Sequence, residues 1–143
     1  MPLFTSDQKI DLLKKVPMFN ELSNRHLREI SKHSDNVAKK AGDVLVRQGD
    51  KGWELFFIIG GKARVEKDGR VIRSLASGDF FGEISLIDRE PRTASVIAET
   101  DMDLLVVHSR SFSHLLDTTP GLSGKILISL CKYLRRAEKD INL

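Results

Sequence analysis

The chain has 143 residues, of which 41% are hydrophobic and 30% charged, values typical of one soluble domain. Its net charge of +3 is too small for binding to nucleic acid by charge alone. The single cysteine, Cys131, excludes an internal disulfide and favours a reducing compartment. Because the longest apolar run is the five residues 55–59 and the N-terminus lacks a signal-like apolar region, we expect a cytoplasmic protein with no membrane span.

Residues 5–34 predict two short helices. Thr5, Ser6 and Asp7 each offer a side-chain oxygen that can cap the first helix, and Ser23 is expected to cap the second. In the second helix, Leu27 and Ile30 share one face. These helices should therefore pack one apolar side each onto the rest of the domain.

The pattern changes to short β-rich runs over residues 36–108. The runs DVLVR, ELFFII, ARVEK, TASVIA and DLLVV are separated by glycines at turn-like intervals, and Asp68-Gly69 is a hairpin turn. Since no helix-sized segment separates the runs, a parallel βαβ sheet is excluded. We expect an antiparallel, jelly-roll-like β-roll, also described as a double-stranded β-helix.

Helical spacing returns over residues 109–140. Phe112 and Leu115 predict a short helix, and Pro120 is expected to open a longer one. The fold class is thus mainly β with flanking helices, and residues 1–143 form a single domain.

Catalytic and metal-binding alternatives find little support. A cupin-like metal site needs clustered histidines, but His26 and His33 lie in the first helical region and His108 and His114 around the later one, so we expect no metal. The segment SRSFSH is typical of a serine N-cap and a short helix rather than of a nucleophile and base. Cys131 is interpreted as a small core or interface residue, and the chain as no enzyme.

The segment FGEISLIDREPRTASV, residues 81–96, combines features suited to an anionic ligand. Gly82 allows a ligand to approach the backbone, and the residues after it can turn so that free N–H groups face an anion. Arg92 offers a planar fork of donors for two phosphate oxygens. An ionised Glu83 can only accept hydrogen bonds, so a sugar hydroxyl is its natural partner.

This segment resembles the phosphate-binding cassette of the cyclic nucleotide-binding domain family, which includes catabolite activator proteins, regulatory subunits of cyclic-AMP-dependent protein kinase and cyclic nucleotide-gated channels. The stretches AGDVLVRQGDKGWELFFIIGGKARV and PMFNELSNRHLREI also resemble that family, so the likeness covers about residues 17–138. The resemblance implies a ligand-binding role for Gly82, Glu83, Ile84, Ser85, Arg92, Thr93 and Ala94.

Within that set, the resemblance implies that Gly82, Ile84 and Ser85 present backbone N–H groups to ribose and phosphate. Glu83 would accept from the ribose 2′-hydroxyl, and Arg92 would bind the exocyclic phosphate oxygens. The hydroxyl of Thr93 would accept from the amino group of a guanine base in the syn conformation.

Three further positions are implied around the base. Val65 and Ile72 correspond to apolar base contacts in the family, and both equally fit ordinary barrel core. The last helix would close over the base as a lid, with Tyr133 either stacked on the purine or packed on the barrel beside its neighbours.

We therefore expect a sensor that binds cyclic AMP, with cyclic GMP as a second candidate ligand, and that acts on an unknown effector protein. The alternative is a fragment of a larger transcription regulator or channel whose effector domain is absent from this chain. An apolar stripe on the last helix predicts a monomer, packed on its own barrel, or a weak dimer through that helix; it comprises Leu127, Leu130, Leu134, Ala137 and Ile141.

Overall fold

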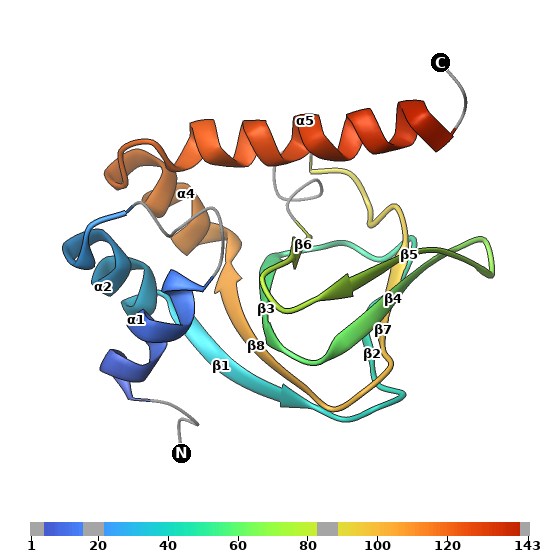
Figure 1. Cartoon of the computed structure of the whole chain (residues 1–143), viewed down its shortest axis with the longest axis horizontal. Coiled ribbons are helices and arrows are strands. Elements are labelled where there is room, and N and C mark those ends of the chain that lie inside the picture. The colour runs from blue at the N-terminus through green and yellow to red at the C-terminus, as the bar shows by residue number, and fades with distance from the viewer. Residues whose placement is uncertain (1–4, 16–21, 83–88, 141–143) are drawn as a thin grey trace.

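The computed structural model describes residues 5–15, 22–82 and 89–140, which form two antiparallel β-sheets with three short helices gathered at one end and the last, long helix running alongside the sheets (Figure 1). The first sheet has the order β1-β8-β3-β6 and contains β1 (Ser34–Lys39), β8 (Met102–His108), β3 (Glu54–Gly60) and β6 (Phe80–Phe81). The second has the order β2-β7-β4-β5 and contains β2 (Val44–Val46), β7 (Ser95–Ala98), β4 (Lys62–Lys67) and β5 (Arg70–Ala76). The expected antiparallel β-roll is confirmed.

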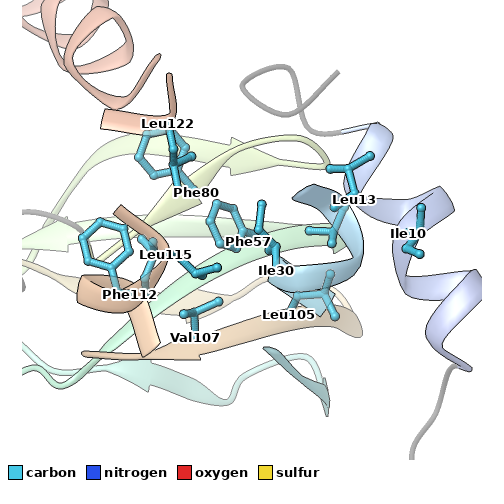
Figure 2. Close-up of a cluster of buried hydrophobic side chains, with 12 residues drawn as sticks. Ile10, Leu13, Ile30, Phe57, Phe80, Leu105, Val107, Phe112, Leu115 and Leu122 are labelled. Carbon is cyan, nitrogen blue, oxygen red and sulfur yellow. The ribbon is translucent and has the colours of Figure 1, made fainter. Parts of the chain in front are cut away.

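The first sheet is covered on both faces, which explains the continuous apolar runs of its central strands. In β3, Phe56 and Ile58 point into a core between the two sheets, whereas Leu55 and Phe57 join a second core beneath the helices. Side chains alternate between the faces of a strand, so a strand buried on both faces needs an apolar residue at every position. Figure 2 shows the second core, to which both the sheet and the helices contribute.

The N-terminal helices are α1 (Ser6–Lys14) and α2 (Asn24–Lys32). The Thr5 side chain, one of the three candidates, caps α1. The Ser23 hydroxyl accepts a hydrogen bond from the backbone N–H of His26, so the predicted cap of α2 is confirmed. Leu27 and Ile30 are fully buried in the core beneath the helices, as their shared face predicted.

The C-terminal helices are α4 (Ser109–Thr118) and α5 (Leu122–Asp140). The prediction of a serine cap on α4 was wrong, because the capping position is His108 and its side chain makes no capping hydrogen bond. α5 begins after Pro120 because Gly121, with φ of +83°, has left-handed rather than helical backbone.

Helix α5 is buried at its first residue and carries exposed apolar side chains further along. Leu122 is buried, but Leu127 and Leu134 are 61% and 64% exposed, so the prediction that this stripe packs on its own barrel was wrong at these two positions. Cys131 is also exposed, which excludes the core interpretation for it. Ile141 lies outside the described residues, as do the side chains of Leu130 and Ala137. None of the described helices is long and apolar enough to cross a bilayer.

Candidate ligand site around Arg92

Arg92 is buried, with 6% of its surface exposed, in the segment that leads into β7. Its Nη1 donates to the carbonyl oxygen of Gly82 and its Nη2 to that of Glu54, each at 2.9 Å. A buried cation is tolerated only with such partners. The two hydrogen bonds fix the plane of the guanidinium between the end of β6 and the start of β3.

The backbone of Arg92 is held by the loop that precedes β3. Its N–H donates to the carbonyl of Asp50 at 2.7 Å, and its carbonyl accepts from the N–H of Gly49 at 2.9 Å. Gly52, further along this loop, lies so close to the guanidinium that a Cβ atom there would overlap it. The loop therefore sets both the backbone and the side chain of Arg92.

Position 82 requires a glycine, both because of its backbone conformation and because of the atoms around it. Its φ of +96° is a left-handed conformation that side chains rarely adopt. A Cβ on Gly82 would also lie 2.7 Å from both Arg92 Nη1 and the carbonyl oxygen of Glu54. The sequence predicted that a ligand approaches Gly82, and among the described residues the guanidinium of Arg92 and the carbonyl group of Glu54 both approach it closely.

The remaining cassette residues divide between described and undescribed parts of the chain. Thr93 is exposed beside Arg92, and Ala94 is half-buried against the core between the sheets. Glu83, Ile84 and Ser85 lie outside the described residues, as does the side chain of Tyr133, whose backbone belongs to α5. The structure thus brings together Gly82 and Arg92, and the roles of the others stay predictions.

Val65 and Ile72 differ in their surroundings. Val65 is buried in the core between the sheets, whereas Ile72 is 57% exposed, so the core interpretation of Ile72 was wrong. β5 is the edge strand of the second sheet, and the paired residue Val71 beside Ile72 is likewise exposed, at 58%. The contact of Ile72 with a base stays a prediction.

Sequence reasoning missed the two residues that orient Arg92. Glu54 contributes its backbone carbonyl, a group that every residue has, so the residue type at this position does not indicate the role. Gly52 was visible only as one glycine among the several that separate the strands. The close spacing of Gly49 and Gly52 before an apolar strand is the one sequence feature that distinguishes this loop from the other turns.

The geometry suits recognition of an anion. A guanidinium fixed in orientation presents its charge and its donors without first losing conformational freedom, which favours affinity for a phosphate or carboxylate.

Comparison with known proteins agrees with this geometry. Residues 37–119 match the model of the family described as cyclic nucleotide-binding domain. The cAMP-dependent protein kinase regulatory subunit of Schizosaccharomyces pombe is 36% identical over 106 residues, which are 73% of this chain and 26% of that protein. The cGMP-dependent protein kinase of Caenorhabditis briggsae is 36% identical over 116 residues, 76% of this chain and 16% of that protein.

Among solved structures, the catabolite activator protein of Thermus thermophilus is similar with a TM-score of 0.80 and 27% identity. The similarity covers 88% of this chain and 62% of that one. This chain spans about a quarter and about a sixth of the length of the two kinase relatives. The likeness therefore concerns one module of larger proteins.

Proposed function

This chain belongs to the cyclic nucleotide-binding domain family, and on that premise we propose that it binds cyclic AMP through Arg92 and repositions α5 in response. The observation that carries the proposal is the buried guanidinium of Arg92, held by the carbonyl groups of Gly82 and Glu54 at the start of the cassette. A planar fork in this position matches two phosphate oxygens. Calorimetric titration with cyclic AMP tests the proposal.

Glu83 is proposed to read the ribose 2′-hydroxyl of the ligand. Replacing cyclic AMP by its 2′-deoxy analogue should weaken binding to the native chain by roughly 1–3 kcal/mol, because the carboxylate is left desolvated without a donor. Glu83→Gln should weaken cyclic AMP binding and reduce the difference in binding free energy between cyclic AMP and its 2′-deoxy analogue. Titrations of both chains with both ligands give the coupling energy, and a coupling of zero would show that the groups do not touch.

Thr93 is proposed to set the choice between purines. The relatives include kinases named for cyclic AMP and for cyclic GMP, so family membership leaves this choice open. Thr93 is exposed beside Arg92, where its hydroxyl is accessible to a base. Thr93→Ala should weaken the binding of cyclic GMP more than that of cyclic AMP, by about 0.5–1.5 kcal/mol for the loss of one hydrogen bond. Competition binding with both ligands measures this, and equal losses contradict the role.

Helix α5 is proposed to act as the lid. Leu127, Ile128 and Leu134 are exposed on it, and burying a leucine or isoleucine side chain contributes about 1.5–3 kcal/mol. Closure over a bound nucleotide would cover part of this surface, with Tyr133 as the proposed contact to the base. A ligand shifts such a helix only through its different affinity for the open and closed states.

The chain is further proposed to be regulatory and without catalytic activity of its own. Its partner would be an effector protein, either a separate chain or a further domain, since the relatives named as kinase subunits and channels are several times longer than the matched region. Titration of a candidate effector with and without cyclic AMP would show whether the ligand changes the affinity between the two.

A further inference from the structure

Three side chains capable of binding a metal meet between α2 and α4. Glu29 and His33 come from α2 and its C-terminal cap, and His114 comes from α4. Oε1 of Glu29 lies 3.4 Å from Nε2 of His33 and 3.7 Å from Nε2 of His114. One ligating atom from each residue lies within 4.8 Å of the other two.

The fold, rather than local spacing, brings the two histidines together. Their ring centroids are 5.0 Å apart, although the residues are far apart in the sequence. α2 and α4 meet because Leu27 and Ile30 of the first and Phe112 of the second pack into the same core (Figure 2). The sequence argument concerned a cupin-like cluster on a strand and did not consider histidines brought together from two helices.

We propose that Glu29, His33 and His114 form a binding site for a divalent first-row transition metal ion, with Zn²⁺ as the expected ion. Two imidazole nitrogens and one carboxylate oxygen are a donor set that such ions accept, and zinc sites with three protein ligands keep a fourth position for water. The site is separate from Arg92 and does not depend on nucleotide binding.

The distances agree with a tetrahedral ion. Zn–N bonds of about 2.0–2.1 Å and Zn–O bonds of about 2.0–2.2 Å place neighbouring tetrahedral ligands roughly 3.3–3.5 Å apart. The two separations from Glu29 Oε1, 3.4 and 3.7 Å, are close to this value. To bind one ion, the nitrogen atoms of the two imidazoles must move closer together. The side chain of His114 is 49% exposed and has room to turn.

The carboxylate is oriented for one-oxygen binding. Oε2 of Glu29 faces Nζ of Lys32 at 3.8 Å, whereas Oε1 faces both histidines. All three side chains are partly exposed, so an ion can enter from solvent.

A bound ion would join α2 to α4, and through α4 to the start of α5. An ion that binds only the folded chain also stabilises it by mass action. Metal binding at this site should therefore raise the melting temperature and slow amide exchange in both helices.

The test is calorimetric titration of the tag-free chain with ZnCl₂, together with Co²⁺ as a spectroscopic probe. We expect saturable binding of one Zn²⁺ per chain and the intense visible absorption of tetrahedral Co²⁺. Glu29→Gln, which keeps the shape of the side chain, and His114→Ala should each weaken Zn²⁺ binding by more than the roughly 10–100-fold that loss of an outer partner costs.

His108→Ala is the matched control, because His108 is also exposed and lies at the start of α4, outside the cluster. Its affinity for Zn²⁺ should equal that of the native chain, and melting without metal shows whether each variant is folded. If the native chain shows no saturable binding, or if Glu29→Gln and His114→Ala bind Zn²⁺ as tightly as His108→Ala does, the cluster is an ion pair only and the proposal is overturned.

Discussion

Replacing Arg92 by leucine is expected to weaken cyclic AMP binding by about 2–5 kcal/mol, the cost of removing one partner of a desolvated charge pair. Since 1.4 kcal/mol corresponds to about a factor of ten, the dissociation constant should rise by more than tenfold. Arg92→Lys should recover part of the affinity, because it keeps the charge and loses the planar fork. Calorimetric titration of the three chains measures the effect.

Arg92 also has a structural role, which the experiment must separate from ligand binding. Its hydrogen bonds to Gly82 and Glu54 join β6 to β3, and leucine removes both. The melting temperature of the free protein should therefore fall, with the loss offset in part because a cation is no longer buried. If Arg92 had only a structural role, Arg92→Leu would have a lower melting temperature than the native chain. At temperatures well below that melting temperature, it would still bind cyclic AMP with the affinity of the native chain.

Gly52→Ala is expected to weaken cyclic AMP binding by at least about tenfold, or 1.4 kcal/mol, and to lower the melting temperature of the free protein, as Arg92→Leu does. The new Cβ overlaps the guanidinium of Arg92, which is the free end of a flexible side chain and can move aside. The backbone at Gly52 requires no left-handed conformation, so alanine itself is tolerated there. The displaced guanidinium would lose its hydrogen bonds to Gly82 and Glu54, and with them the orientation that suits phosphate.

Gly60→Ala is the matched control for this prediction. Gly60 also lacks a left-handed backbone, and its nearest neighbour, a carboxylate oxygen of Asp103, would lie 3.6 Å from the new Cβ, an ordinary contact. This variant should bind cyclic AMP like the native chain. Equal affinity of Gly52→Ala and Gly60→Ala, with both folded, would mean that the position of Arg92 does not control binding.

The elements that sequence reasoning predicted well are those set by local physics. Helix caps at Thr5 and Ser23 depend on residues within one turn, and the Asp68-Gly69 hairpin depends on two residues that both adopt positive φ, 53° and 81°. The antiparallel roll followed from short apolar runs with turns between them. In each case the information lies within a few neighbouring residues.

The failures share a different cause, because each depends on contacts between distant segments. The exposure of Ile72 depends on the place of β5 at the edge of its sheet, and that of Leu127 on the way in which α5 packs against the rest of the domain. The orientation of Arg92 depends on a carbonyl group of Glu54, 38 residues earlier. His33 and His114 meet only because two helices share one core. Spacing along the chain does not contain this information.

The central claim is that the guanidinium of Arg92, oriented by the Gly52 loop and by Gly82, binds the phosphate of a cyclic nucleotide. The most direct test is calorimetric titration of the native chain and of Arg92→Leu with cyclic AMP and cyclic GMP under identical conditions. The account predicts saturable binding of one nucleotide per native chain, and binding weakened by more than about tenfold in the variant. Saturable binding of equal affinity in both chains, or no binding of either nucleotide to the native chain, would contradict it.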